Sequence, residues 1–129
     1  MNQPLAYVHP GAKIAKNVVI EPFTTIHNNV EIGEGTWIGS NVTIMEGARI
    51  GKNCRIFPGA KDRYRTAIGK NCLIQAYSHI AHDCIVGDNC IFSNSSTLAG
   101  HVTVGDYVVL AGMVAVHQFC TIGSHSFIT

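Results

Sequence analysis

The sequence predicts an all-β protein, a parallel β-helix of about seven triangular coils, and three observations support this prediction. Large apolar residues recur every six residues, small residues recur two positions before them, and Asn or Gly often follows three positions after them. Apolar residues make up 47% of the 129 positions, too few for such regular columns to arise by chance. A unit of this kind must stack on its neighbours to bury its apolar face.

The two apolar columns define the strands. Twenty of the 21 members of the large column are apolar, and the exception is Asp62. The small column contains only Ala, Val, Thr, Ser and Cys. Residues two apart on a strand face the same side, so each repeat is a short strand with one small and one large inward side chain. Three such strands, and thus three hexapeptide repeats, close one triangular coil.

The cysteines belong to this pattern. Their number is odd, no two are spaced as Cys-x-x-Cys, and a zinc ribbon or dithiol motif is therefore absent. We expect buried, small apolar side chains instead of metal ligands or disulfides. All five fall in the small inward column: Cys54, Cys72, Cys84, Cys90 and Cys120.

The corner position, three residues after each large one, divides the chain into two halves. Asn and Gly adopt positive φ at low cost, whereas unfavourable residues at a regular position point to function. We therefore interpret the first half as a structural scaffold and expect the functional site in the second half. Through residue 71 the corner is mostly Asn or Gly, at Gly11, Asn17, Asn29, Gly35, Asn41, Gly47, Asn53, Gly59 and Asn71. Later corners are Tyr77, Asp83, Asn89, Ser95, His101, Tyr107, Met113, Phe119 and His125.

Composition excludes several classes of function. The formal net charge is +1, which gives no field for binding nucleic acid. No apolar run approaches the ~20 residues that span a bilayer, and the N-terminus lacks a secretory pattern. We therefore expect a cytoplasmic protein without membrane insertion. Charged residues form only 13% of the chain, which favours an oligomer.

A cluster of histidines gives the candidate chemistry. Residues three repeats apart stack on successive coils, which places His82 in one column with Gly100 and Gln118, and Asp83 in the next column with His101. The imidazole of His82 fits a general base, and Asp83 fits the carboxylate that orients it. The Gly100 backbone N–H, without a side chain, fits the donor to an oxyanion. No Ser or Cys is placed as a nucleophile, so we expect a substrate hydroxyl to attack a thioester directly.

The same region resembles the UDP-N-acetylglucosamine acyltransferases, and the resemblance extends over nearly the whole chain. The stretches that carry it are Ser78–Cys84 (SHIAHDC), Asn94–Val102 (NSSTLAGHV) and Gly112–Phe119 (GMVAVHQF), with Val8–Pro10 and Ile20–Phe23 in support. The resemblance implies a left-handed parallel β-helix built from hexapeptide repeats, and a homotrimer with active sites in the clefts between subunits.

The resemblance also implies an activity and its residues. The family transfers a 3-hydroxyacyl chain from acyl carrier protein to the 3-hydroxyl of UDP-N-acetylglucosamine, the first step of lipid A biosynthesis. His82, Asp83 and Gly100 would be catalytic, without a metal or other cofactor. The residues that would contact the sugar nucleotide are His79, His101, His117 and Gln118.

Two departures from the family pattern concern chain length. The family has several dozen further residues between Ala60 and Lys61, including a loop that binds substrate, and this sequence keeps its six-residue phase across that join. The family also continues beyond Thr129 into a C-terminal helical domain. We therefore expect a single β-helix domain over residues 1–129, shortened internally and at its C-terminal end.

Three alternatives remain open. The first is a β-helix scaffold derived from this family with little or no activity, because substrate-binding segments are missing. The second is a zinc enzyme of the γ-carbonic anhydrase type, for which the histidines between 79 and 125 would supply ligands. The third is a sibling N-acyltransferase, against which the His-Ile-Ala-His-Asp and Ala-Val-His-Gln-Phe patterns argue.

Overall fold

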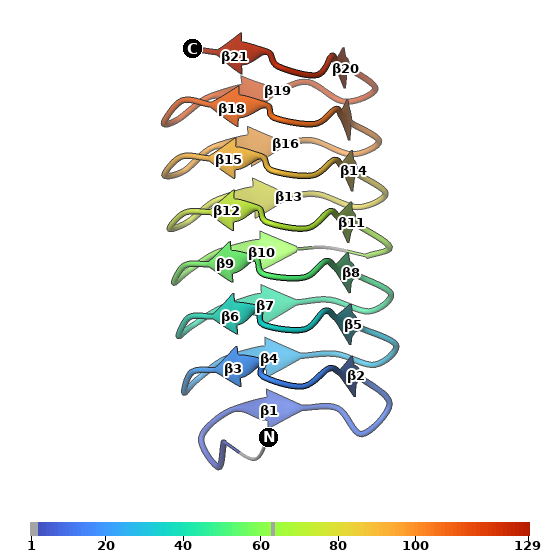
Figure 1. Cartoon of the computed structure of the whole chain (residues 1–129), viewed down its shortest axis with the longest axis vertical. Coiled ribbons are helices and arrows are strands. Elements are labelled where there is room, and N and C mark those ends of the chain that lie inside the picture. Colours follow the sequence, from blue (N-terminus) through green and yellow to red (C-terminus); the bar gives the residue numbers. More distant parts are fainter. Residues whose placement is uncertain (1–2, 63) are drawn as a thin grey trace.

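The computed structural model describes residues 3–62 and 64–129, and it is a β-helix whose coils are stacked along one axis (Figure 1). Twenty-one strands of two residues each form three parallel sheets of seven strands. The chain passes through the three sheets in turn, so each coil takes three hexapeptide repeats. The predicted left-handed parallel β-helix of about seven coils is confirmed. Within the described ranges, no helix has the length and apolar character that crossing a membrane would require.

The strands are named here by sheet. Sheet A contains β1 (Tyr7–Val8), β4 (Thr25–Ile26), β7 (Thr43–Ile44), β10 (Lys61–Asp62), β13 (His79–Ile80), β16 (Thr97–Leu98) and β19 (Ala115–Val116). Sheet B contains β2 (Lys13–Ile14), β5 (Glu31–Ile32), β8 (Arg49–Ile50), β11 (Ala67–Ile68), β14 (Ile85–Val86), β17 (Thr103–Val104) and β20 (Thr121–Ile122). Sheet C contains β3 (Val19–Ile20), β6 (Trp37–Ile38), β9 (Arg55–Ile56), β12 (Leu73–Ile74), β15 (Ile91–Phe92), β18 (Val109–Leu110) and β21 (Phe127–Ile128).

Every strand pairs with the equivalent strand of the adjacent coil, which keeps corresponding residues stacked. In sheet A, His79 is opposite Lys61 on one side and Thr97 on the other. The same register holds at the join after Ala60, because β10 pairs in parallel with both β7 and β13. The backbone ladder of sheet A is therefore continuous across that join.

The large inward column forms the core, as predicted. Phe92 is the largest fully buried side chain, and Ile80 and Leu98, next to the candidate site, are completely buried. The column is only partly buried in the first and last coils, for example at Val8 and Ile128, because each end of the stack has a neighbouring coil on one side only.

The small inward column also forms hydrogen bonds between coils, which the residue pattern alone does not predict. Its hydroxyl and thiol groups donate to a backbone carbonyl oxygen of the next coil. Thr66 Oγ1 donates to the Ala81 carbonyl at 2.6 Å, and Cys72 Sγ donates to the Gly87 carbonyl at 3.2 Å. A buried carbonyl without a partner is costly, so these hydrogen bonds are a second reason for Ser, Thr and Cys in this column beside their small size.

The cysteines behave as predicted, with one correction. In the described residues, four are buried and all five are free thiols, whereas Cys120, in the last described coil, is exposed. Contact with the Cys54 thiol, together with burial, raises the pKa of Cys72 to about 12. The neighbouring thiol of Cys72 and burial also raise the pKa of Cys90. These two thiols therefore stay protonated and are poor nucleophiles or ligands.

The corner residues adopt positive φ in both halves of the chain. The prediction is correct for the Asn corners, at φ values such as 57° for Asn17, and wrong for Gly11, which does not have a positive φ. Bulky corners follow the same rule, and Met113 and Phe119 have φ of 63° and 64°. Side chains there cost conformational energy that Asn and Gly avoid.

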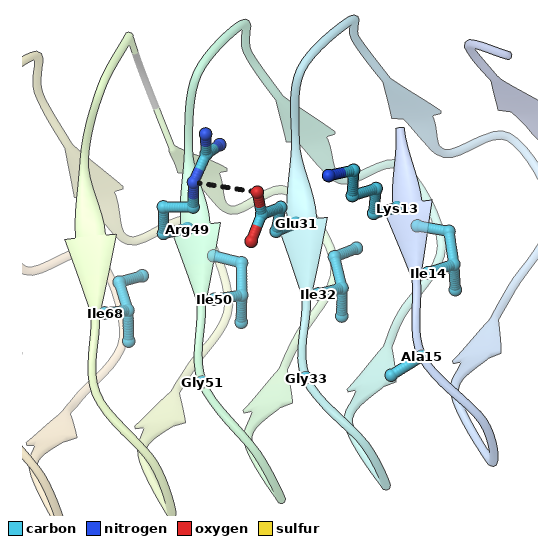
Figure 2. Close-up of a pocket in the computed structure, with 10 residues that line it drawn as sticks. All are labelled: Lys13, Ile14, Ala15, Glu31, Ile32, Gly33, Arg49, Ile50, Gly51 and Ile68. Atoms are coloured by element: carbon cyan, nitrogen blue, oxygen red, sulfur yellow. Dashed lines mark ion pairs between the residues drawn. The ribbon is translucent and has the colours of Figure 1, made fainter. Parts of the chain in front are cut away.

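A column of glycines allows the coils to approach closely along sheet B (Figure 2). A Cβ added to Gly51 would lie 2.5 Å from the carbonyl carbon and oxygen of Gly69, which are backbone atoms of the next coil. The first member of the column is Ala15, whose backbone nitrogen lies 3.1 Å from the carbonyl oxygen of Ile32. The equivalent distance from the nitrogen of Gly51 to the carbonyl oxygen of Ile68 is 2.8 Å. The glycines, each following a strand of sheet B, are Gly33, Gly51, Gly69, Gly87, Gly105 and Gly123.

We expect the Gly51→Ala substitution to lower the free energy of unfolding by about 1–3 kcal/mol, the usual cost of overpacking. The new methyl group meets backbone atoms, which cannot rotate away as a side chain can. The matched control is Gly123→Ala in the same column, where an added Cβ has no atom within 4 Å. Urea denaturation followed by circular dichroism measures both, and equal stability of the two variants would contradict this role of the column.

Candidate active site

His82 and Asp83 form the corner between β13 and β14, and backbone hydrogen bonds fix that corner to its neighbours. The Asp83 N–H donates to the carbonyl of Tyr64 on the preceding coil at 2.9 Å. The His101 N–H donates to the His82 carbonyl at 3.1 Å, and the Phe119 N–H donates to the Gly100 carbonyl at 3.2 Å. The predicted columns are thus stacked in the structure, one coil above another.

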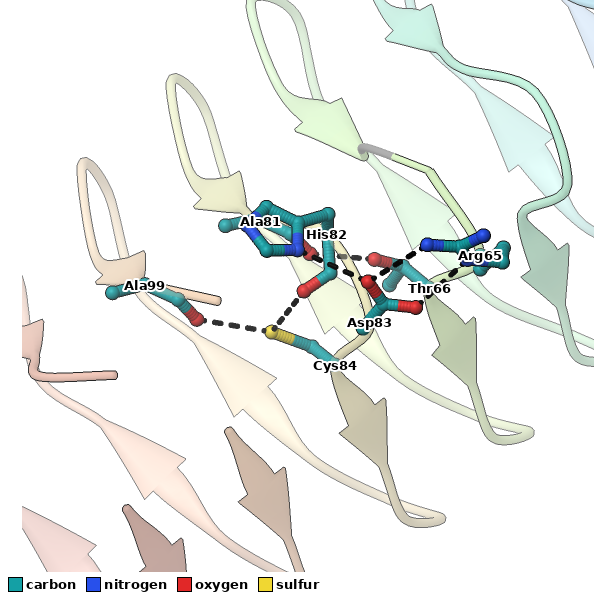
Figure 3. A network of polar contacts seen from close by, with 7 residues as sticks. All are labelled: Arg65, Thr66, Ala81, His82, Asp83, Cys84 and Ala99. Atoms are coloured by element: carbon teal, nitrogen blue, oxygen red, sulfur yellow. Dashed lines mark hydrogen bonds and ion pairs between the residues drawn. The ribbon is translucent and has the colours of Figure 1, made fainter. Parts of the chain in front are cut away.

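The side chains of His82 and Asp83 belong to a polar network (Figure 3). His82 Nδ1 lies 3.1 Å from Asp83 Oδ2, and the His82 side chain is 51% exposed. The guanidinium of Arg65, one coil earlier, contacts both oxygens of Asp83: Nε to Oδ1 at 2.9 Å and the terminal nitrogen Nη2 to Oδ2 at 3.3 Å. Since an ionised carboxylate only accepts hydrogen bonds, Asp83 favours the tautomer with the proton on Nδ1. Nε2 is then left as the basic nitrogen.

The charge state of Asp83 follows from these contacts. The hydrogen bond from Arg65, followed by that from His82, lowers the pKa of Asp83 to about 2. Asp83 in turn raises the pKa of Arg65. Asp83 is therefore a carboxylate throughout the physiological pH range, and it can orient an imidazole and stabilise its protonated form.

Gly100 lies directly against the imidazole of His82. A Cβ added to Gly100 would be 2.7 Å from two ring atoms of His82, Cε1 and Nε2, so the ring can occupy this place only because residue 100 has no side chain. Gly100 is buried, and in the described part of the chain its N–H has no hydrogen-bond partner. An unpaired donor beside a candidate base is a position that a developing oxyanion can use.

His101 extends the cluster by one coil. Its ring lies edge-on to that of His82, with 5.1 Å between centroids, and is stacked on Phe119 with 4.9 Å between centroids. A nitrogen or oxygen atom from each of His82, Asp83 and His101 lies within 4.8 Å of the others, a spacing that a metal ion can bridge. Any such ion would compete with the guanidinium of Arg65, which already holds both oxygens of Asp83.

The remaining predicted residues lie around this cluster. His117 and Gln118 are exposed on the next coil, and His117 Nδ1 lies 3.2 Å from the Gln118 carbonyl oxygen. His79 points from the outer face of sheet A and lines a separate hollow of about 280 Å³ with Lys61 and Tyr77. The hollow beside His82, of about 330 Å³, is lined instead by Asn29, Glu46, Gly47, Tyr64, Arg65, His82 and Asp83. The structure therefore brings together His82, Asp83, Gly100 and His101, and places His79 outside their hollow.

Arg65 is the member of this network that the sequence analysis missed. It occupies the corner column one coil before Asp83, and it has a positive φ of 55°. An arginine among corners that are mostly Asn or Gly was the available signal. The same reasoning that selected the corners after residue 72 applies to it.

Comparison with known proteins supports a transferase relationship. Residues 29–61 and 65–100 match the family model described as bacterial transferase hexapeptide (six repeats). The solved UDP-N-acetylglucosamine acyltransferase of Francisella novicida is 36% identical over 100% of this chain, with a TM-score of 0.79. LpxA of Acinetobacter baumannii is 33% identical over 98% (TM-score 0.71), and the UDP-N-acetylglucosamine acyltransferase of Campylobacter jejuni is 34% identical over 97% (TM-score 0.67).

The lengths of these proteins differ from that of this chain. The chain spans 60% of the Francisella protein, 66% of the Acinetobacter protein and 64% of the Campylobacter protein. No curated protein matches the sequence.

Proposed function

Since the chain belongs to the bacterial transferase hexapeptide family, we propose that it is an acyltransferase with His82 as its general base. The observation that carries this proposal is the joint position of three groups. Asp83 holds one nitrogen of His82, and Gly100, with its unpaired N–H, lies against the ring. A base and an oxyanion donor side by side are the two groups that transfer of an acyl chain to a hydroxyl requires.

The proposed reaction is a direct attack of a substrate hydroxyl on a thioester. His82 Nε2 takes the hydroxyl proton while the hydroxyl oxygen bonds to the thioester carbon. The Gly100 N–H donates to the resulting oxyanion, and Asp83 stabilises the imidazolium. The intermediate then collapses, the carbon–sulfur bond breaks, and the imidazolium returns its proton to the departing thiolate. Proton and charge therefore balance without a metal or other cofactor.

The proposed substrates follow the similar proteins. They are UDP-N-acetylglucosamine, acylated on its 3-hydroxyl, and acyl carrier protein that bears a 3-hydroxyacyl group, as in the first step of lipid A biosynthesis. The 36% identity to an enzyme named for UDP-N-acetylglucosamine supports the acceptor. We propose that His101, His117 and Gln118 contact the sugar nucleotide, and that His79 contacts it from a neighbouring subunit or a separate subsite. A homotrimer in the cytoplasm is the setting that this proposal requires.

Turnover tests the proposal. Purified protein is incubated with UDP-N-acetylglucosamine and carrier proteins bearing 3-hydroxyacyl chains of several lengths, and mass spectrometry measures the product. The expected result is a sugar nucleotide whose mass has increased by one 3-hydroxyacyl group. A folded protein that forms no product with any chain length would favour a non-catalytic scaffold. Stoichiometric zinc, with hydration of CO₂ that a chelator abolishes, would favour the zinc enzyme.

We expect Gly100→Ala to lower kcat by about 10²-fold or more, because the substitution keeps the backbone N–H but its methyl group takes the place of the His82 ring, the proposed general base. The new methyl group would displace the His82 ring, which is half exposed and can move aside, so the stability of the fold should change little. The matched control is Gly112→Ala, because an added Cβ there approaches no atom closer than 3.5 Å. If Gly100→Ala had wild-type kcat, Gly100 would not belong to the reacting centre.

A further inference from the structure

We propose that Arg65 is a positioning residue of this site: it fixes Asp83 so that one carboxylate oxygen faces His82. The inference rests on the proposed function. Arg65, which lies on the preceding coil, would then act together with His82 and Asp83.

The geometry of the pair is specific. Nε and Nη2 of Arg65 reach different oxygens of Asp83, an arrangement that fixes the plane of the carboxylate as well as its place. Asp83 Oδ2 is also the atom that lies 3.1 Å from His82 Nδ1. Rotation of the carboxylate away from His82 would therefore break a contact with Arg65 at the same time.

The backbone and the neighbouring coil prepare Arg65 for this contact. Its N–H donates to the Glu46 carbonyl at 3.2 Å, and its φ of 55° is unfavourable for a long side chain. A Cβ added to Gly47, one coil earlier in the same column, would lie 3.2 Å from Arg65 Cγ, so the glycine leaves room for the arginine stem. Strain at a corner that is otherwise suited to Gly or Asn indicates a functional constraint.

Stability does not account for the pair. The Arg65 side chain is 74% exposed, and ion pairs at such positions contribute little to folding. Its contact instead fixes the carboxylate that faces the imidazole. Among the described residues, the charged or titratable groups around His82 include Asp83, Arg65, His101, Glu46 and Tyr64. Without Arg65, the Asp83 carboxylate is free to rotate away from His82 Nδ1, and the imidazole loses its fixed orientation.

The test compares Arg65→Leu, Arg65→Lys and the control Lys16→Leu. Lys16 also forms an exposed ion pair, with Glu34 at 3.8 Å, and its side chain is 76% exposed, so its loss matches the change in charge away from the site. We expect Arg65→Leu to lower kcat about tenfold through the misplaced base, with KM for the acceptor unchanged. Arg65→Lys should restore only part of the kcat, because an ammonium group cannot hold both oxygens.

A second measurement needs no activity and separates this inference from the proposed function. Carboxyl NMR should place the titration of Asp83 near pH 2 in the wild type and in the ordinary aspartate range in Arg65→Leu. The His82 ring resonances should shift in Arg65→Leu and stay unchanged in Lys16→Leu. If Asp83 titrates alike and His82 does not respond, the positioning role is wrong, whether or not the chain transfers acyl groups. Wild-type kcat in an active Arg65→Leu variant would also overturn it.

Discussion

Replacing His82 by Ala is expected to lower kcat by about 10²- to 10⁴-fold, the usual contribution of a general base. The imidazole lies against Gly100, and Asp83 orients its Nδ1. The side chain is half exposed and carries no part of the core, so the fold should remain intact. Initial rates of acyl transfer measure the effect, and thermal unfolding checks the fold.

The matched control for His82 is His125→Ala. His125 is also an exposed corner histidine, and its ring is stacked on Tyr107 at 5.0 Å, just as His101 is stacked on Phe119. It lies at the corner between sheets B and C, whereas His82 lies between sheets A and B. We expect wild-type rates for this variant. A rate for His82→Ala within a factor of two or three of the wild type would remove His82 from the mechanism.

Replacing Phe92 by Ala is expected to lower the free energy of unfolding by about 3–5 kcal/mol. Phe92 is 1% exposed and stands in a column otherwise filled by aliphatic residues of sheet C. Truncation leaves a cavity between coils whose backbone spacing is fixed by the strand ladder, so the neighbours can collapse only partly into it. Because coils in a solenoid are stabilised mainly by their neighbours, the loss should weaken the coils on both sides.

Phe127 offers the comparison for Phe92, since it belongs to the same sheet but points outward and is exposed. Phe127→Ala should change stability by less than about 0.5 kcal/mol, as expected for an exposed substitution. Urea denaturation of both variants measures the difference. Similar urea midpoints for Phe92→Ala and Phe127→Ala would mean that the inward column does not contribute most of the stabilising free energy of the core.

The sequence was sufficient to predict the coils because the hexapeptide spacing specifies which residues point inward. Ile80, Leu98 and Phe92 could be assigned to the core by counting alone, and the three sheets confirm that assignment. The same counting predicted that His82 stacks beneath Gly100 and Asp83 beneath His101, although their chemical roles remain predictions. Counting works here because every coil has the same length, so sequence distance translates directly into position.

Other features depended on side-chain conformation or on the ends of the stack. Arg65 reaches Asp83 through a long side chain whose direction the repeat does not fix. Cys120 follows the inward pattern yet is exposed, because burial needs a coil on both sides. His79 is close to His82 in sequence, but it points from the face of a sheet whereas His82 lies on a corner. Sequence proximity was therefore a poorer guide than the column of equivalent positions on successive coils.

The uniform register also limits how such a chain can change during evolution. An insertion or deletion of three hexapeptide repeats adds or removes one coil and returns every later residue to its own sheet. A change of one or two repeats between His82 and Gly100 would keep the inward pattern but move Gly100 to a different corner, away from His82. An added coil at the same place would lie between them, because the two residues are in contact only on adjacent coils. Lineages that retain this corner cluster can therefore gain or lose coils only outside residues 65–101, whereas the core alone would accept any number of repeats.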